Sequence, residues 1–181
     1  QMAEFWNQQV EPLRAFRWFM TIGTGGSGEN QIETWAIKTV KKPSFTISET
    51  QHQYVAHTFY YPGRITWNPI DVTFVDPVVT KTSTNLFRML LNAGYEAPVA
   101  NDVALKSFSK KTFGDTIGDV VIHQIDTDGQ TIPNTSWELK NPFITSADFG
   151  QLDYSSEELV VNSVTFRYDY AVIDGVSATS S

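Results

Sequence analysis

Two glycine-rich or acidic stretches carry residue types that could bind phosphate or calcium. The pattern G-x-G-x-x-G of dinucleotide-binding turns is spelled by Gly23-Thr24-Gly25-Gly26-Ser27-Gly28, and Glu49 follows about twenty residues later. A dinucleotide fold needs alternating strands and helices, whereas this chain predicts one clear helix. The P-loop pattern also fails, because Glu29-Asn30 stands where Lys and Ser/Thr must reach phosphate and magnesium. We therefore interpret 23–28 as a flexible loop.

The calcium and serine-nucleophile patterns are equally incomplete. A calcium loop would begin as Asp126-Thr127-Asp128-Gly129 does, but the glycine comes at the fourth position and Trp137 stands where the bidentate glutamate belongs. A serine nucleophile sits in an elbow such as G-x-S-x-G, and Ser27 lacks the second glycine. The acidic stretch is better explained as a hairpin turn, for which Asp-Gly is a strong signal.

The sequence contains few residues that could support histidine or cysteine chemistry. There is no cysteine and there are three histidines, which excludes zinc ribbons, iron–sulfur sites, thiol nucleophiles and disulfide scaffolds. His52 and His57 are five residues apart, a spacing that puts them on opposite faces of one strand. His123 has no acidic companion at ligand spacing. The sequence therefore predicts no catalytic residue, no metal site and no cofactor.

The composition excludes further classes of protein. The 181 residues include 20 acidic and 13 basic side chains, a formal charge of −7, which disfavours tight binding to nucleic acid. No stretch approaches the roughly 18 apolar residues of a membrane-spanning helix, so we expect no membrane anchor and no signal peptide. Aromatic residues make up 13% and charged residues only 18% of the chain. Many aromatics with few charges is typical of large permanent interfaces, although an aromatic-rich core would give the same composition.

Most of the first half of the chain alternates with the period of two expected of strands. The predicted strands are 16–22, 34–40, 51–61, which closes at a Pro62-Gly63 turn, and 64–75. The last of these changes the parity of its apolar residues at Asn68-Pro69, where we predict a bulge. The period then becomes helical within 80–94, with Thr82 or Ser83 as the cap and Gly94 as the stop.

The second half begins with a long loop and ends with the longest alternation in the chain. We interpret 95–118 as a loop with a short helical turn near 109–113, and 119–126 with 135–140 as a hairpin. A short strand at 143–149 is followed by a polar connection at 150–158. The stretch 159–173 would extend roughly 50 Å as one strand, so it either twists across two sheets or lines a barrel.

Two stretches resemble the tail tube proteins of contractile-tailed bacteriophages. The first reads Phe59-Tyr60-Tyr61-Pro62-Gly63-Arg64-Ile65-Thr66-Trp67, followed by Ile70-Asp71-Val72-Thr73-Phe74. The second, which is more specific, runs from Leu139-Lys140-Asn141-Pro142-Phe143-Ile144 through 148–157 to Val164-Thr165-Phe166-Arg167-Tyr168-Asp169-Tyr170-Ala171. The order of the elements matches over nearly the whole chain, while 23–28 and 97–118 match no pattern of the family.

The resemblance implies a mainly β protein, a β-sandwich or β-barrel subunit with one flanking helix. It implies one domain over 1–181, with an N-terminal arm at 1–15 and a frayed tail at 175–181. Six subunits would close into a ring with a continuous inner β-barrel, and stacked rings would form the inner tube that a contracting sheath drives through the host envelope. The positions that carry the family motif, and are candidates for assembly, are Pro62, Gly63, Asn141, Pro142, Phe143, Asp148 and Tyr154.

The resemblance also implies partners and a place in the cell. The partners are other copies of the chain, the tail sheath, the baseplate and the tape-measure protein, and DNA passes through without tight binding. The place is the tail of the virion, assembled in the cytoplasm of the bacterial host. The polar residues of 159–173, which are Ser163, Thr165, Arg167 and Asp169, are then predicted to face the channel, where an acidic excess would keep DNA from adhering.

Two other functions stay open. A tube protein of a phage-derived contractile injection device, or of type VI secretion, would share the fold and carry protein. A carbohydrate-binding sandwich would instead use Trp67, Trp137 and the tyrosines as a stacking platform, although both tryptophans are in phase with the apolar faces of their strands. The first alternative would assemble, and the second would be a monomer of about 20 kDa.

Overall fold

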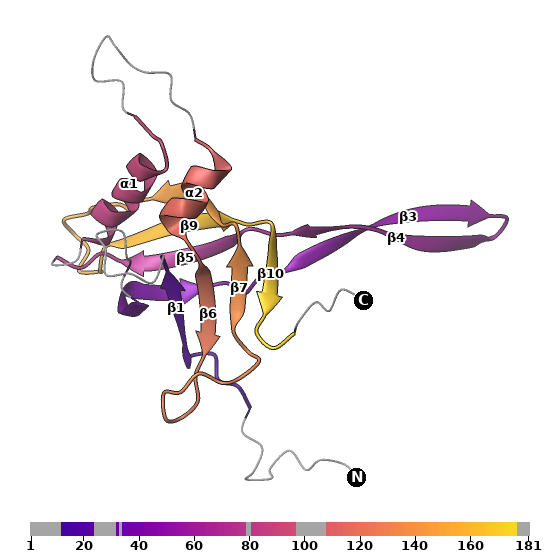
Figure 1. The fold of residues 1–181 in the computed structure, drawn as a ribbon, viewed down its shortest axis with the longest axis horizontal. Coiled ribbons are helices and arrows are strands. Elements are labelled where there is room, and N and C mark those ends of the chain that lie inside the picture. Colours follow the sequence, from indigo (N-terminus) through magenta and orange to yellow (C-terminus); the bar gives the residue numbers. More distant parts are fainter. Residues whose placement is uncertain (1–11, 24–31, 33, 79–80, 97–107, 177–181) are drawn as a thin grey trace.

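The computed structural model describes residues 12–23, 32, 34–78, 81–96 and 108–176. In this part of the chain, two four-stranded sheets are accompanied by two helices and a long two-stranded hairpin (Figure 1). The mainly β class is confirmed. The glycine loop from Thr24 to Gly28, and most of the predicted N-terminal arm and tail, lie outside the described residues.

Sheet A contains four short antiparallel strands. They lie in the order β1 (Trp18–Ile22), β6 (Val120–Gln124), β7 (Trp137–Lys140) and β10 (Tyr170–Ile173). The pairing of β6 with β7 confirms the predicted hairpin. Its turn is closed by Asp126, whose Oδ1 accepts hydrogen bonds from the N–H groups of Asp128 and Gln130, each at 2.9 Å. The acidic stretch therefore serves as a turn.

Sheet B places the apolar residues of its central strands on one face. Its antiparallel strands lie in the order β2 (Ile37–Val40), β5 (Ile70–Val75), β9 (Val161–Arg167) and β8 (Phe143–Asp148). A one-turn 3-10 helix, η1 (Thr34–Ala36), leads into β2 and replaces the first half of the strand predicted at 34–40. The core face of β5 and β9 is formed by Ile70, Val72, Phe74, Val164 and Phe166, all buried.

The strand predicted over 159–173 is two strands that belong to different sheets. β9 ends at Arg167 and β10 begins at Tyr170, so the chain crosses from sheet B to sheet A at a corner. The prediction of one continuous strand is wrong, whereas its alternative of a strand crossing two sheets is correct. The alternation of buried and more exposed residues continues through the corner, because Tyr168 is buried there in the same phase as Val164 and Phe166.

The first helix, α1 (Thr82–Asn92), agrees with the period of its apolar residues. It turns Leu86 and Met89 into the core and ends before Gly94, which adopts φ of 111° as the predicted stop requires. Its cap differs from the prediction, because Lys81 occupies the N-cap position without a side-chain hydrogen bond. Asp76 supplies the acceptor instead, through Oδ1 to the N–H of Ser83 at 3.3 Å.

The second helix, α2 (Lys110–Ile117), is longer than the turn predicted near 109–113. Ser109 caps it, since Oγ accepts a hydrogen bond from the N–H of Thr112 at 3.1 Å. Phe113 and Ile117 anchor it in the core. Among the described residues, no helix is both long and apolar enough to span a membrane.

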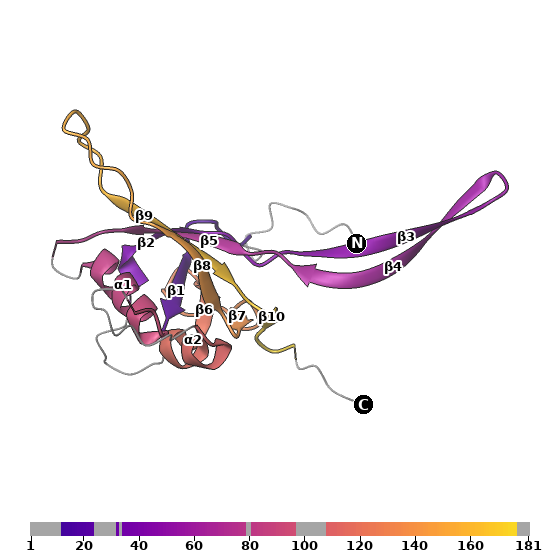
Figure 2. The same ribbon diagram turned by 90° about the horizontal axis from the view of Figure 1, so that it is seen from above.

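A single apolar core lies between sheet B, the helices and sheet A. Figure 2 shows α1, α2 and sheet A together on one side of sheet B, with its other face left open. The chain crosses between the two sheets twice: β7 of sheet A leads into β8 of sheet B, and β9 of sheet B leads into β10 of sheet A. The largest fully buried side chains are Phe74, Phe166, Met20, Ile22, Ile70, Met89, Ile117, Ile122, Leu139, Val72, Val120 and Val164.

The long hairpin, defined as β3 (Phe45–Tyr54) with β4 (His57–Trp67), projects far from this core (Figures 1 and 2). It continues the β2–β5 pair of sheet B outward, and nearly all of its residues are exposed. The chain reverses at Val55-Ala56, so the prediction of a turn at Pro62-Gly63 is wrong. The bulge predicted at Asn68-Pro69 within one strand is wrong, because β4 ends at Trp67 and a separate strand, β5, begins at Ile70.

Candidate assembly interface

The base of the long hairpin is held to the body by aromatic rings that pack at steep angles to one another. Phe45 and Trp67 are cross-strand partners with ring centroids 5.4 Å apart, and Trp67 packs against the buried Tyr168 at 6.1 Å. Next to them, the N–H of Asn68 donates a 2.8 Å hydrogen bond to the carbonyl of Ser44. These contacts fix the direction in which the hairpin leaves sheet B.

The middle of the long hairpin contains a bulge built on Ser48, Pro62 and Gly63. The register shifts between Ile47 and Glu49, and the N–H of Arg64 donates to Ser48 Oγ at 2.9 Å. A Cβ on residue 63 would lie 2.3 Å from Ser48 Oγ and 2.9 Å from its carbonyl oxygen, so only glycine fits. Proline is tolerated in a strand at such a bulge. The two motif residues therefore shape a strand and do not end it.

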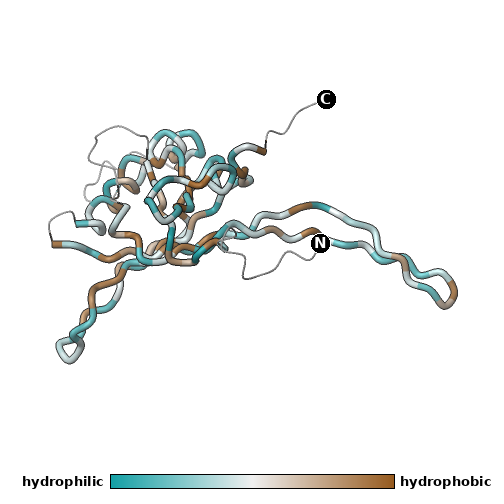
Figure 3. Tube along the Cα trace, turned by 90° about the horizontal axis from the view of Figure 1, so that it is seen from below, coloured by the Kyte–Doolittle hydropathy of each residue, from teal (hydrophilic) through white to brown (hydrophobic). Residues whose placement is uncertain are grey.

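The bulge transfers the apolar side chains from one face of the hairpin to the other. Between the base and the bulge, the pairs Phe45–Trp67 and Ile47–Ile65 share one face. Beyond the bulge, Phe59 and Tyr61 lie on the opposite face, each an exposed aromatic. Figure 3 shows the resulting apolar segments along both strands of the hairpin. A two-stranded hairpin is only marginally stable alone in water, so this surface is suited to binding a partner.

The histidine prediction needs a correction. His52 and His57 lie on the same face of the long hairpin, because the chain reverses between them and His52 pairs with Phe59 while His57 pairs with Tyr54. His123 is in sheet A, stacked on Phe19 at 4.5 Å, with Nδ1 2.9 Å from Ser136 Oγ. Burial lowers the pKa of His123, and nearby Asp174 opposes that shift. Among the described residues, no group of three or more His, Asp or Glu side chains could hold a metal.

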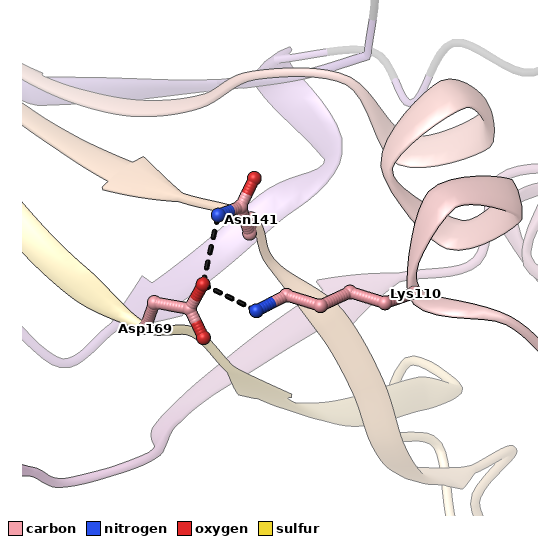
Figure 4. A network of polar contacts seen from close by, with 3 residues as sticks. All are labelled: Lys110, Asn141 and Asp169. Atoms are coloured by element: carbon pink, nitrogen blue, oxygen red, sulfur yellow. Dashed lines mark hydrogen bonds and ion pairs between the residues drawn. The ribbon is translucent and has the colours of Figure 1, made fainter.

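The corner between the sheets is held by a three-residue network (Figure 4). Asp169 Oδ2 accepts hydrogen bonds from Lys110 Nζ at 2.5 Å and Asn141 Nδ2 at 2.8 Å, which connects α2 to both crossings between the sheets. The bond from Lys110, followed by that from Asn141, lowers the pKa of Asp169. Asn141 has φ of 54°, a left-handed conformation that asparagine tolerates better than most residues. Pro142 is buried beside it, and Phe143 packs on Phe113 of α2 at 6.2 Å.

The outer strands of sheet B carry opposite charges. In the described part of the chain, β2 and β8 each pair on one side only. The β2 edge has the exposed lysines Lys38 and Lys41, whereas β8 ends at the exposed Asp148. The loop after β8, which we call the β8–β9 tip (149–160), adds Asp153, Glu157 and Glu158 and no basic residue. Unpaired edges of opposite sign on one subunit are complementary to each other.

The β8–β9 tip is an exposed extension that turns on hydrogen bonds of its own. Asp148 Oδ1 accepts from the N–H of Gly150 at 2.9 Å, and Asp153 Oδ1 accepts from the N–H of Ser155 at 2.8 Å. The bonds from Ser155 lower the pKa of Asp153. Tyr154, one of the motif residues, is fully exposed at the end of this loop. It has the position of a contact residue and contributes nothing to the core.

The outer face of sheet B is polar. Three of the four residues predicted to face a channel, Ser163, Thr165 and Arg167, alternate on β9 with the buried core residues. Thr165 Oγ1 donates a 2.8 Å hydrogen bond to Asp71 Oδ1 on the neighbouring strand. Asp169 lies beyond the end of β9, in the network with α2. Among the described residues, sheet B thus has a polar outer face and two outer strands that each pair on one side only.

Solved structures with this arrangement come from contractile systems. A chain in the cryo-EM structure of the sheath/tube terminator of an extracellular contractile injection system, PVC, in the extended state matches with a TM-score of 0.65 and 16% identity, over 92% of this chain and 99% of that chain. The 6-fold symmetrised baseplate of the anti-feeding prophage contains a chain with a TM-score of 0.63 and 15% identity, over 92% and 98%. The sheath–tube complex of the PVC system gives a TM-score of 0.60 and 18% identity, over 91% and 93%.

The chain shares its fold with chains of contractile injection systems. This agrees with the family that the sequence resembles. No protein-family model matches the sequence, and no curated protein is significantly similar to it. At these identities the likeness concerns the tube-protein fold, so the function must be argued from the surfaces described above.

Two parts of this interface could not be identified from the sequence. The face change in the long hairpin depends on the pairing register, and the signal for it is Pro62-Gly63 within a run of β-branched and aromatic residues. The charge difference between β2 and β8 depends on knowing that these two strands are the outer ones. Once a tube-protein fold is known, both can be assigned from residue types alone.

Proposed function

We propose that this chain is the structural subunit of the inner tube of a contractile system. Six copies close into a ring by pairing the β2 edge of one sheet B with the β8 edge of the next, and rings stack into a tube. The observation that carries the proposal is the pair of unpaired, oppositely charged edges of sheet B. An interface between unlike surfaces of identical subunits forms a ring when its rotation closes.

The direction of the strands supports this closure. Sheet B is antiparallel throughout, so β2 and β8 run in opposite directions. A neighbouring copy related by rotation about the ring axis therefore presents β2 antiparallel to β8, and the ring becomes one continuous barrel without free edges. Pairing of β2 with β2, or of β8 with β8, would bring like charges together. Charge thus favours the head-to-tail arrangement.

The long hairpin and the β8–β9 tip then extend out of the ring on opposite sides. Figure 2 shows them leaving sheet B in opposite directions along its strands. Both consist of exposed residues, and both carry motif positions predicted for assembly, namely Pro62, Gly63 and Tyr154. We propose that these extensions contact the rings above and below, with the sheath bound outside and the baseplate and tape-measure protein met at the ends.

The cargo in our proposal is DNA, and the device is a phage tail. Sheet B turns its polar face to the channel, with Ser163, Thr165 and Arg167 on the wall. The formal charge of −7 per copy repels the phosphate backbone, and a conduit must not retain what passes through it. The second candidate is a tube that carries protein. It is favoured by the likeness in fold to chains of PVC and anti-feeding prophage structures.

Electron microscopy of the purified protein tests the proposal. We expect rings or long tubes with a central hole, and charge reversal of Lys38 and Lys41 to glutamate should abolish them. Combining this change with Asp148→Lys and Glu157→Lys should restore part of the assembly, since the complementary pair is exchanged. A protein that stays monomeric at high concentration would exclude the tube, and a monomer that binds a glycan array would indicate the carbohydrate-binding sandwich. The genes that neighbour this one, capsid and terminase or neither, distinguish the two kinds of cargo.

A further inference from the structure

An apolar groove lies beside β8, the acidic outer strand of sheet B. It has a volume of about 660 Å³ and is open to solvent along the two helices. Its walls are Leu86, Phe87 and Leu90 of α1, Phe108 before α2, and the run from Phe143 to Ala147 of β8 with Phe149 beyond it. Phe87, Phe108 and Phe149 are each exposed, although they belong to an apolar surface. We call this cavity the helix groove.

The helix groove has two ends that can be told apart. Phe113 of α2 contacts Phe143 at the start of β8, and Lys110 lies by the corner that precedes it. The α2 end is therefore at the beginning of β8. Figure 2 places α1 farther from the corner, toward the β8–β9 tip. Leu86 and Leu90 of α1 line the groove together with Ala147 and Phe149.

Antiparallel pairing of neighbouring sheets determines which segment of the next copy reaches that end. When β2 of one copy runs antiparallel to β8 of another, the start of β2 lies beside the end of β8. The residues just before β2 are those of η1, Thr34 to Ala36. The long hairpin follows β2 and leaves in the opposite direction, past the start of β8. Of these two segments, η1 is the one carried to the α1 end of the groove.

The middle residue of η1 is a tryptophan with 63% of its surface exposed. Its neighbours Ala36 and Ile37 are buried, which fixes the backbone and turns Trp35 outward. η1 packs against β1 of sheet A, so it lies on the same side of sheet B as the helices and their groove. Tryptophan is the residue most enriched among those that dominate binding at protein interfaces, especially when it fills an apolar pocket.

Building on the proposed ring, we propose that Trp35 of each copy inserts into the helix groove of the next, against Leu86, Leu90 and Ala147. The occupant of the groove is thus a second copy of this chain. The charges of the two edges are complementary in sign, because β2 contains the exposed Lys38 and β8 ends at the exposed Asp148.

Substitution of Trp35 is the first test. Trp35→Ala should raise the protein concentration needed for assembly by roughly 30-fold or more, the effect typical of losing one dominant interface residue. Trp35→Phe should keep most of the assembly, because an aromatic ring still enters the groove. Thermal unfolding of the monomer is measured for all three forms, so that an effect on assembly can be separated from an effect on folding. Assembly of Trp35→Ala at the wild-type concentration would overturn the inference.

Crosslinking is the second test. Because the chain contains no cysteine, only the introduced thiols can react. In tubes assembled at the higher protein concentration that loss of the Trp35 ring requires, the pair Trp35→Cys and Ala147→Cys should be joined between copies by a short bis-maleimide, giving a ladder of covalent oligomers up to a closed ring. The matched pair Val55→Cys and Ala147→Cys tests the tip of the long hairpin as the occupant instead. The inference would be overturned if only the Val55 pair gave a ladder, or if neither pair gave one in intact tubes. Either result would leave the proposed tube itself unaffected. If the wild-type protein forms no rings or tubes, the proposed function fails and the inference fails with it.

Discussion

Gly63 controls the shape of the long hairpin through an absent side chain. Its Cα lies against Ser48, where a Cβ would overlap the carbonyl oxygen at 2.9 Å. Because backbone atoms cannot move aside as a flexible side chain can, any other residue must open the bulge. The bulge is what places Phe59 and Tyr61 on the opposite face from Ile47 and Ile65. One residue thereby decides which partner surface the outer half of the hairpin can meet.

We predict that Gly63→Ala prevents tube growth without unfolding the body. The hairpin must shift its register or open its bulge, while the core, to which residue 63 contributes nothing, keeps its free energy of unfolding within about 0.5 kcal/mol. Tube length by electron microscopy and thermal unfolding measure the two effects. Gly114→Ala in α2 is the matched control, because its Cβ would meet no atom within 4 Å. Equal tube lengths in both variants would contradict the prediction.

The network at the corner predicts a dependence on pH. Hydrogen bonds from Lys110 and then Asn141 lower the pKa of Asp169 below its ordinary value. A lowered carboxyl pKa contributes stability that is present above about pH 4 and is lost as the pH falls through the folded-state value. Asp169→Asn should therefore be less stable than wild type at pH 7, by less than about 1 kcal/mol because the pair is largely exposed. The difference should shrink as the pH falls below about 4, as followed by chemical denaturation at each pH.

At the scale of elements, substitutions in the outer half of the long hairpin should affect the stacking of rings without affecting the closure of each ring. Phe59 and Tyr61 lie on one face and Tyr60 on the other, and all three are exposed. We predict that Phe59→Ser with Tyr61→Ser yields single rings that do not elongate, because their apolar contact with the next ring is lost. Tyr60→Ser is the control on the opposite face and should elongate normally. Sedimentation velocity separates rings from tubes, and equal elongation in both variants would count against the assigned face.

The elements also show how far the sequence could predict this molecule. The period of α1 identified a real helix, since it depends on local periodicity, whereas the parity change at Asn68-Pro69 marks a break between two strands and not the predicted bulge. The strands predicted across 51–61 and 159–173 had wrong ends for two physical reasons. A bulge can hold Pro62-Gly63 inside a strand, and a corner can preserve alternation when Tyr168 is buried. The pairing of strands distant in sequence, which creates the two edges of sheet B, is not encoded in any local pattern.

At the scale of the whole molecule, the composition is better explained if neighbouring copies cover much of the surface than if the protein is a monomer. Only 18% of the residues are charged, and many of the exposed aromatics lie on the long hairpin. A monomer would gain nothing from uncovered rings of Phe59 and Tyr61, whereas a stacked ring buries them. Assembly should also stabilise the fold by mass action. We therefore predict a thermal midpoint that rises with protein concentration, measured by differential scanning fluorimetry, and that is constant for the Trp35→Ala variant over the same range.

If the outer face of sheet B lines the channel, as we propose, its charge should determine whether the tube retains DNA. Asp71→Lys with Ser163→Lys adds three positive charges per copy to the outer face of sheet B, where Asp71 and Ser163 are exposed on adjacent strands. Tubes assembled from this variant in the presence of short duplex DNA should retain DNA that is protected from nuclease and released by salt, because cations bind phosphate by displacing counterions. Wild-type tubes should retain none. Asp128→Lys with Thr127→Lys makes the same change in charge at the turn between β6 and β7, in sheet A. If these control tubes protect DNA equally well, the polar face of sheet B does not line the channel, and the wall must be formed by another surface of the subunit.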